Sequence, residues 1–418
     1  MLLGCIADDF TGASDAASFL VKGGMQTLLL NGIPEHINNA DVANADAIVV
    51  ALKTRTQETD SAVQDSLEAI KWLEKHGAKH FYVKYCSTFD STPKGNIGPI
   101  NDAVMDYLQV PYTLLCPSLP VNGRIVQDGI LYVHGVPLAE SHMKDHPLTP
   151  MHESDITLLM KPQSKYQSYK LVSDVDEWNW QIKKLQQASK NKPFYLVPDY
   201  AADEDAAYIV NNFGSAKLLT GGSGLLTAWG KYLANKLVSV PATVMEGTKG
   251  AGILLAGSCS KATLAQIKCS QAAGVPSFKL NPAMIVAGTQ TIKDVEEFFK
   301  VHPDEAVLIY SSESPEYLEA IRNTHLPEFS AALEKMMADI AVMARDKGIN
   351  RIIVAGGETS GAVTKALGYS SYWIGESVAP GVPMMMPAEN QNLRLVLKSG
   401  NFGQEDFFQR ALALTGQI

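Results

Sequence analysis

The 418-residue sequence has few cysteines and no long hydrophobic run. Its five cysteines are widely spaced and form no C-x-x-C pair, which favours reduced thiols in a cytoplasmic protein over a disulfide framework. No apolar run approaches the roughly 18 residues of a membrane span. The first residues carry no basic flank of the kind that precedes the apolar core of a signal peptide. We therefore expect a cytoplasmic protein that does not enter a membrane.

An excess of basic charge is also missing. The net charge is −9 at pH 7, which argues against a nucleic-acid binder because such proteins need a basic face. The sequence contains neither the Walker A pattern nor G-x-G-x-x-G, which disfavours a P-loop enzyme and a dinucleotide oxidoreductase. With 46% hydrophobic residues the chain can bury a sizeable core, and its length predicts two or three domains at roughly 150 residues each.

Short apolar runs recur along the chain, each followed by a polar or glycine-rich turn and then by a helical pattern. Such alternation is typical of an α/β domain with a mostly parallel sheet. The runs occupy residues 2–7, 47–52, 81–86, 112–116 and 194–197, and then residues 252–256, 306–310, 351–355 and 393–398. We predict two domains, each a mostly parallel sheet flanked by helices, with a nucleotide cleft between them. They are expected to span residues 1–243 and 250–418.

One region interrupts the alternation. Asn122-Gly123 and Asp128-Gly129 flank short β-rich runs and predict hairpins around residues 117–136. Residues 137–150 are rich in proline and histidine and are typical of a long loop, which we interpret as a lid or a site wall.

The clearest candidate for a phosphate-binding turn follows the apolar run at residues 351–355. Its residues are Gly356, Gly357, Glu358, Thr359, Ser360 and Gly361. Glycines let backbone N–H groups approach a phosphate, and the N-terminus of the following helix adds positive potential. The alternative is a simple tight turn between strand and helix. Two further turns, residues 257–261 and 399–403, favour the phosphate site, and residues 220–224 have the composition to face the same cleft.

Paired carboxylates follow the first predicted strand. Asp8 and Asp9 have the chemistry to accept a proton from a hydroxyl or to bind Mg²⁺, whereas helix capping explains one of them but not both. Asp90 follows the third predicted strand. Three cations stand near other strand ends: Arg55, Lys84 and Arg124. Each alone is typical of a solvated surface charge, but cations and carboxylates at one rim suit a small hydroxy acid.

Together these elements resemble the four-carbon acid sugar kinase family. The matching segments are Ala7-Asp8-Asp9-Phe10-Thr11-Gly12-Ala13, Lys84, Asp90-Ser91-Thr92, Gly95-Asn96, Gly222-Ser223-Gly224, Gly257-Ser258 and Gly356-Gly357-Glu358-Thr359. The similarity extends to Gly403 and so covers essentially the whole chain. Residues 85–92, 116–124 and 146–151 look like the 3-oxo-tetronate kinase branch of the family. Pro93-Lys94 departs from the Leu-Arg of many relatives, which leaves the substrate contact at that turn open.

The resemblance implies a kinase whose N-terminal domain binds the acid sugar and whose C-terminal domain binds ATP. The implied reaction phosphorylates the terminal hydroxyl of the sugar acid, converting 3-oxo-tetronate to 3-oxo-tetronate 4-phosphate. Mg²⁺ would bridge the β- and γ-phosphates, with no separate metal site built from the protein. The residues expected to hold ATP are Ser258, Gly356, Gly357, Glu358, Thr359, Ser360, Gly361, Gly400 and Gly403.

The same resemblance assigns roles in the N-terminal domain. The predicted substrate-binding residues are Asp8, Arg55, Lys84, Ser91, Asn122 and Arg124. Asp9 or Asp90 is the predicted catalytic residue, which orients the terminal hydroxyl and accepts its proton, with Asp8 as the next alternative. The sequence does not choose among these carboxylates.

Three alternatives stay open at this point. The nearest is an erythronate or threonate 4-kinase of the same family. A non-catalytic acid-sugar sensor would bind the ligand without ATP turnover, and the second glycine-rich unit argues against it. A dehydrogenase is disfavoured because the dinucleotide fingerprint is absent. A homodimer is expected only because it is the commonest oligomeric state.

Overall fold

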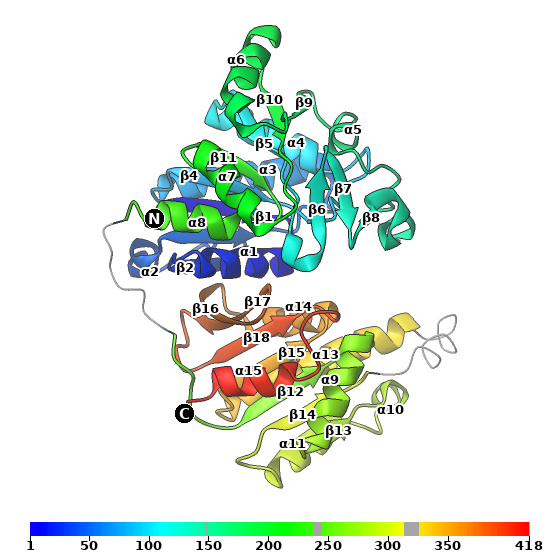
Figure 1. The fold of residues 1–418 in the computed structure, drawn as a ribbon. Coiled ribbons are helices and arrows are strands. Elements are labelled where there is room, and N and C mark those ends of the chain that lie inside the picture. The colour runs from blue at the N-terminus through cyan, green and yellow to red at the C-terminus, as the bar shows by residue number, and fades with distance from the viewer. Residues whose placement is uncertain (147–148, 238–244, 313–325, 418) are drawn as a thin grey trace. The chain divides into compact units, whose positions relative to one another are not determined.

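The computed structural model describes residues 1–146, 149–237, 245–312 and 326–417 (Figure 1). The chain divides into two compact units, Met1–Thr243 and Val244–Ile418, and each is described here by itself. None of the helices in the described ranges is long and apolar enough to cross a membrane.

The first unit is built on a parallel sheet with the strand order β11-β4-β1-β3-β2. Its strands are β1 (Leu3–Ala7), β2 (Thr27–Asn31), β3 (Ala47–Ala51), β4 (His80–Lys84) and β11 (Leu218–Gly221). They are short, apolar and almost wholly buried, as expected when helices cover a parallel sheet. The neighbouring helices are α1 (Phe10–Lys22), α2 (Asn39–Asn44), α3 (Thr59–Lys75), α4 (Ile97–Leu108) and α8 (Leu226–Ala234); α1 packs on α8, and α3 packs on α4.

Two small sheets complete this unit. A parallel one has the order β5-β10-β9 and is made of β5 (Tyr112–Leu114), β9 (Gln167–Lys170) and β10 (Phe194–Val197). An antiparallel one is made of β6 (Arg124–Gln127), β7 (Ile130–Val133) and β8 (Val136–Pro137). The remaining helices are α5 (Ile156–Met160), α6 (Trp178–Ala188) and α7 (Asp203–Phe213), with 3-10 turns η1 (Pro120–Asn122), η2 (Leu138–Glu140), η3 (His142–Asp145) and η4 (Val175–Glu177).

The hairpin prediction for residues 117–136 is confirmed between β6 and β7. Their turn is Asp128-Gly129, and both residues have positive φ, as a two-residue hairpin turn requires. The predicted loop at residues 137–150 is more regular than expected, because much of it forms η2 and η3. Residues 147–148 of that prediction lie outside the described residues.

The second unit has a sheet of order β16-β17-β18-β15-β12-β14-β13. Its strands are β12 (Gly252–Ala256), β13 (Ser277–Lys279), β14 (Val307–Tyr310), β15 (Arg351–Ala355), β16 (Ser371–Ala379), β17 (Val382–Pro387) and β18 (Arg394–Lys398). The β16–β17 and β17–β18 pairs are antiparallel, and the other pairs are parallel. The helices are α9 (Lys261–Ala272), α10 (Pro282–Val286), α11 (Ile292–Lys300), α13 (Leu326–Asp346), α14 (Gly357–Leu367) and α15 (Phe407–Thr415).

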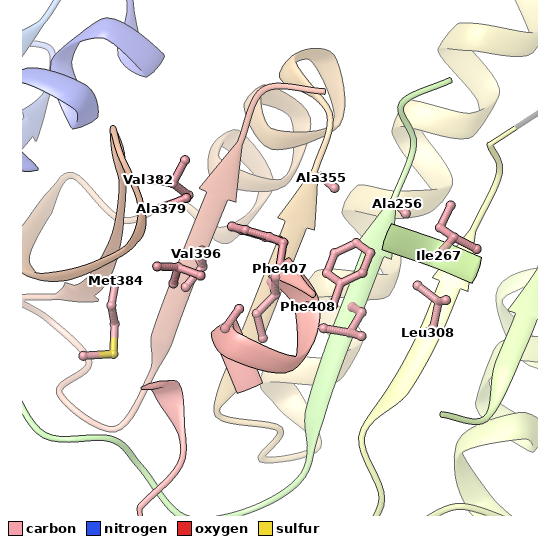
Figure 2. Close-up of a cluster of buried hydrophobic side chains, with 14 residues drawn as sticks. Ala256, Ile267, Leu308, Ala355, Ala379, Val382, Met384, Val396, Phe407 and Phe408 are labelled. Atoms are coloured by element: carbon pink, nitrogen blue, oxygen red, sulfur yellow. The ribbon is translucent and has the colours of Figure 1, made fainter. Parts of the chain in front are cut away.

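A buried apolar cluster fixes the middle of this second sheet. Figure 2 shows Phe407 and Phe408 of α15 packed over the sheet, with Ile267 of α9 beside Leu308. Both phenylalanines are at most 1% exposed, and burying one such side chain stabilises a fold by roughly 1.5–3 kcal/mol. The cluster therefore keeps the neighbouring strands β18, β15 and β12 in register, which places their carboxyl ends side by side.

The α/β prediction is confirmed, with a mostly parallel sheet and flanking helices in each unit. The predicted runs at residues 252–256 and 351–355 coincide with β12 and β15. The strands β2 and β13 were not predicted, although Asn31-Gly32 ends β2 and Asn281-Pro282 follows β13.

Candidate active site

Three neighbouring strands of the first unit carry the predicted acidic and basic residues to one edge. Ala7 at the end of β1 pairs with Ala51 of β3 and with Lys84 of β4, so the three strands end level with one another. A pocket of about 400 Å³, including its opening to solvent, lies at this edge. Its polar lining is Asp8, Thr54, Arg55, Ser66, Lys84, Asp90, Ser91 and Asn96. This is where ligands bind in open α/β sheets, beyond the carboxyl ends of the strands.

Arg55 is the centre of this cluster. Its Nε donates to Asp8 Oδ2 at 2.7 Å and its Nη2 to Asp8 Oδ1 at 3.0 Å, a two-bond pairing that only arginine can make. The same Nη2 lies 3.0 Å from Asp9 Oδ2, and Nη1 lies 3.8 Å from Asp90 Oδ2. One guanidinium therefore lies within 4 Å of three carboxylates. Burial alone would lower the pKa of Arg55, but the charges of Asp8 and Asp9 outweigh it.

Asp9 caps a helix in addition to contacting Arg55. Its Oδ1 accepts from the backbone N–H of Gly12 at 2.5 Å and caps α1. Its other oxygen faces Arg55, and about a third of the side chain is exposed. Burial of the carboxylate raises the pKa of Asp9 above the ordinary value, against the lowering effect of Arg55. A carboxylate with a raised pKa is better suited to accept a proton near neutral pH.

Lys84 lies beneath the two carboxylates and is only 4% exposed. Its Nζ donates to the carbonyl of Tyr85 at 2.9 Å. Burial by itself would lower the pKa of Lys84, but the charges of Asp8, Asp15 and Asp9 together raise it, so the ammonium stays charged. Asp15, whose Oδ2 accepts from Ser223 Oγ at 2.5 Å, was not predicted; its pKa is raised by burial.

The turn that carries Asp90 has an unusual backbone. Phe89 and Asp90 have φ values of 62° and 24°, the left-handed region that a β-carbon disfavours. Thr88 Oγ1 donates to Asp90 Oδ1 at 2.6 Å, and Ser91 Oγ donates to Gln163 Oε1 at 2.8 Å. Strained turns of this kind persist where surrounding contacts hold them, and they concentrate at functional sites.

Two further predicted residues come from η1 and β6. Arg124 Nη1 donates to the backbone carbonyl of Asn122, and Nε of Arg124 is buried with no hydrogen-bond partner among the described residues. Burial lowers the pKa of Arg124, whereas the charge of Asp90 favours its protonated form. Arg124 thus carries an unused donor near Asp90, but the side chain of Asn122 makes no contact that assigns it a role.

A second cluster lies in the second unit, at the carboxyl ends of β12, β15 and β18. Ala355 pairs with Ala256 on one side and Lys398 on the other, so the turns after these strands are neighbours. A β-carbon on Gly257 would lie 2.1 Å from Thr359 Oγ1, and one on Gly400 would lie 2.2 Å from Ser258 Oγ. The three predicted turns are therefore in contact through Ser258, Thr359 and Gly400, whereas a β-carbon on Gly361 would meet no atom within 4 Å and Gly403 lies against Phe407.

The turn after β15 has the features of an anion site. Gly356 has φ of 138°, which only glycine adopts readily, and its N–H donates to the carbonyl of Lys398 at 2.9 Å. Gly357 and Glu358 begin α14 and are exposed, whereas Thr359 and Ser360 are buried. An added β-carbon on Gly357 or Gly361 would meet no atom within 4 Å. This helix N-terminus is thus open to an anionic ligand.

The glycines of residues 220–224 have a different explanation. A β-carbon on Gly221, Gly222 or Gly224 would lie 2.1, 2.5 and 2.2 Å from the carbonyl oxygens of Cys116, Pro117 and Ser118, respectively. These glycines allow two backbone segments of the first unit to pass in contact. Close backbone packing accounts for this turn, so the structure does not support its predicted place in a nucleotide site.

Acidic ligands for a metal are sparse. Among the described residues no group of three or more His, Cys, Asp or Glu side chains is placed to hold a metal ion. In the second unit, burial and then the charge of Glu358 raise the pKa of Glu334 on α13, so these two carboxylates lie near each other.

Comparison with known proteins decides the family. A model described as a sugar-binding N-terminal domain matches residues 3–229, and one described as a nucleotide-binding C-terminal domain matches residues 253–408. The chain belongs to this two-domain family. Within the family it is 40% identical to a 3-oxo-tetronate kinase of Brucella melitensis over 100% of this chain and 96% of the relative. It is 39% identical to a 3-oxo-tetronate kinase of Haemophilus influenzae over 98% of this chain and 99% of the relative.

Solved structures agree with this family assignment. A Haemophilus influenzae protein superimposes with a TM-score of 0.85 at 37% identity, covering 99% of this chain and 100% of that one. A Salmonella typhimurium protein superimposes with a TM-score of 0.89 at 36% identity, covering 98% of both chains. The family descriptions match the two clusters: the acidic and basic pocket lies in the sugar-binding domain, and the glycine-rich turns lie in the nucleotide-binding domain.

Proposed function

We propose that the protein is an ATP-dependent kinase that phosphorylates the terminal hydroxyl of 3-oxo-tetronate to give 3-oxo-tetronate 4-phosphate. The observation that carries the proposal is the set of three carboxylates around Arg55 in a sugar-binding domain. A hydroxyl that attacks a phosphoryl group must be oriented and must lose its proton, and a carboxylate is the common acceptor. The names of the relatives support the same substrate.

The acid sugar would bind at the pocket beyond β1, β3 and β4. Its carboxylate would be held by cations, and Arg55 and Lys84 line the pocket. Arg124 is a further candidate, because its Nε has no partner among the described residues and its guanidinium lies near enough to Asp90 of the lining to feel that charge. Lys84 would supply a second positive charge, besides that of Arg55, that offsets part of the charge of Asp8, Asp9 and Asp15. Asp8 is the weakest candidate for the base, because both of its oxygens accept from Arg55.

Asp9 and Asp90 remain the two candidates for the catalytic base. Asp9 is supported by its raised pKa and its partly exposed side chain. Asp90 is supported by its place in the pocket lining, with one oxygen held by Thr88. We therefore assign the proton transfer to this pair, and the two variants below separate their roles.

ATP would be held at the second cluster. Thr359 and Ser258 would donate hydroxyl groups, and the N-terminus of α14 at Gly357 would face the phosphates. Mg²⁺ would supply neutralisation of the phosphate charge when it is bound. The cytoplasmic location and the homodimer are further parts of the proposal, and light scattering of the purified protein tests the dimer.

The test is ADP release in a coupled assay with purified protein and Mg-ATP. The substrates are 3-oxo-tetronate, erythronate and threonate of both hands, and a blank without acid sugar. The proposal predicts release far above the blank with the 3-oxo acid. A preference for erythronate or threonate would show that the protein is a kinase of the same family with a different substrate. Pro93-Lys94, beside the Asp90 turn, is the reason to test these acids. No release with any acid would overturn the kinase proposal for these substrates.

The variants Asp9→Asn and Asp90→Asn test the base. Each keeps the size of the side chain but removes its ability to take up a proton. We expect the base variant to lose at least about a hundredfold in kcat, because general base catalysis is worth roughly that much, with ATP affinity unchanged. Full activity in both variants would remove the assignment.

A further inference from the structure

Lys398 is a buried cation without an anion. It ends β18 and is 1% exposed. Its Nζ donates to Thr263 Oγ1 at 3.0 Å and to the carbonyls of Ser399 and Gly400 at 3.2 and 2.8 Å. These three acceptors use all three protons of the ammonium group. A fully buried lysine is normally paired with a carboxylate, yet among the described residues no carboxylate faces this one.

The hydrogen bonds around Lys398 set the conformation of the next loop. The carbonyl of Gly400 accepts from Ser260 Oγ at 2.6 Å and from Thr263 Oγ1 at 2.9 Å as well as from Lys398. Because a peptide unit is planar and trans, the N–H of Asn401 points away from this buried cluster. The loop therefore turns a carbonyl inward to the cation and an N–H outward.

The loop so held is part of the nucleotide-site cluster. A β-carbon on Gly400 would lie 2.2 Å from Ser258 Oγ, and the N–H of Ser260 donates to that same Oγ at 3.2 Å. Lys398 thus lies directly behind the turn predicted to meet the phosphates. An anion in front of the turn would supply the negative charge that the described part of the chain does not place beside Lys398.

We propose that Lys398 is a positioning residue for nucleotide binding. It lies behind the loop and orients the Gly400–Asn401 peptide, and its positive charge attracts the phosphates of the nucleotide. The inference rests on the proposed ATP site. It assigns no contact between Lys398 and the nucleotide, so the effect acts through the loop and through the field of the charge.

The proposal makes nucleotide binding depend on a proton. Burial lowers the pKa of Lys398 to about 8. The groups that face its Nζ are the hydroxyl of Thr263 from α9, the two loop carbonyls, and the ring of Phe407 from α15 at 5.6 Å, none of which titrates. Phosphates favour the charged amine, so they raise its pKa, and nucleotide binding above pH 8 takes up a proton.

The experiment is calorimetric titration of the full-length protein with Mg-ADP at pH 7.5, 8.5 and 9.5, in pairs of buffers with different ionisation enthalpies. If the phosphates return the pKa of Lys398 from about 8 to the ordinary value near 10.4, the dissociation constant rises roughly twentyfold between pH 7.5 and 9.5. The difference between buffers then shows uptake of most of one proton at pH 8.5 to 9.5. At these pH values the nucleotide phosphates are already fully ionised.

Four variants identify the proton acceptor. Lys398→Met should bind Mg-ADP at least about tenfold more weakly at pH 7.5 and show no proton uptake, whereas Lys398→Arg should keep its affinity at pH 9.5 because arginine stays charged. Lys268→Met removes an exposed lysine of α9 that lies outside the turn at residues 257–261, and it is the matched control for net charge. Cys259→Ser checks that the thiol in the same turn is not the titrating group.

The outcomes separate the two proposals. If wild-type protein does not bind Mg-ADP at all, the proposed function fails. If it binds with the same affinity from pH 7.5 to 9.5 and takes up no proton, the ATP site stands and the role of Lys398 is overturned. Uptake that persists in Lys398→Met, or is lost in Lys268→Met, would also overturn it. Because the wild-type measurement is decisive, an unstable variant does not remove the test.

Discussion

Arg55 binds Asp8 through two parallel hydrogen bonds of 2.7 and 3.0 Å, and the side chains of the pair are 24% and 13% exposed. The pairing joins the end of β1 to the segment after β3. Because Asp9 and Asp90 also lie within 4 Å of the same guanidinium, its removal would take away the cation that the three carboxylates share and leave Lys84 beside Asp8 and Asp9.

We predict that Arg55→Met lowers the free energy of unfolding by about 2 kcal/mol, less than a fully buried pair would lose because the site is partly exposed. Urea unfolding of the variant measures the change. Lys53→Met, which removes an exposed cation two residues earlier, is the control and should change stability by less than about 0.5 kcal/mol. In the double variant Arg55→Met with Asp8→Asn, part of the loss should return. Additive losses would contradict the pairing.

The second prediction concerns pH. Burial raises the pKa of Asp9, and Lys84 lowers it. If Asp9 is the base, activity is lost as the pH falls through this raised pKa, so the acid limb of kcat/KM lies at a higher pH than for an ordinary aspartate. Lys84→Met removes a cation, raises the pKa of Asp9 further, and should move the limb to higher pH. The measurement is kcat/KM between pH 4.5 and 8.

Lys84→Arg retains the charge and should leave the limb nearly in place. Lys22→Met, at the exposed end of α1, is a control for net charge. A limb that stays fixed or moves to lower pH in Lys84→Met would show that Asp9 is not the group that titrates in this profile.

A third prediction tests the contact between the turns after β12 and β15. In Gly257→Ala the new β-carbon would lie 2.1 Å from Thr359 Oγ1, so the hydroxyl must move. We expect the dissociation constant for Mg-ADP to rise by about tenfold, equivalent to about 1.4 kcal/mol, with the KM for the acid sugar unchanged. Gly361→Ala has no such clash, since its β-carbon meets nothing within 4 Å, and it should unfold no more easily than the wild type.

The Gly361→Ala variant also tests its predicted role. If nucleotide approaches the backbone at Gly361, this stable variant loses affinity, because the methyl group occupies space that is empty without ligand. Unchanged affinity for Mg-ADP would remove Gly361 from the binding residues while leaving the contact between Gly257 and Thr359 in place.

The fourth prediction separates packing glycines from binding glycines. In Gly222→Ala the β-carbon would lie 2.5 Å from the carbonyl oxygen of Pro117, a backbone atom that cannot rotate away. Overpacking of this kind costs about 1–3 kcal/mol, so the variant should unfold at lower urea concentration. The folded fraction should bind Mg-ADP as the wild type does. Weaker binding of Mg-ADP with unchanged stability would show that this turn takes part in nucleotide binding after all.

The sequence predicted well which site residues lie at the ends of strands. Asp8, Arg55, Lys84 and Asp90 each lie close to the end of a strand of one parallel sheet, and the carboxyl ends of such strands meet at one edge. The same reasoning brought Ser258, Thr359 and Gly400 together, since β12, β15 and β18 are neighbours. In both units a local pattern therefore predicts a long-range contact. A polar turn that follows a parallel strand lies at the carboxyl edge of the sheet, beside the turns of the neighbouring strands.

The supporting residues were beyond the reach of sequence reasoning. Gln163 accepts from Ser91 across 72 positions, Ser223 donates to Asp15 across 208, and Thr263 accepts from Lys398 across 135. Their residue types are common on any surface, and no local spacing distinguishes them from solvated side chains. The order of the residues determined the layered α/β units and the chemistry at their strand ends, through burial of apolar runs. Which cation neutralises which carboxylate, and which lysine is buried without one, depends on contacts that exist only once distant segments have packed together.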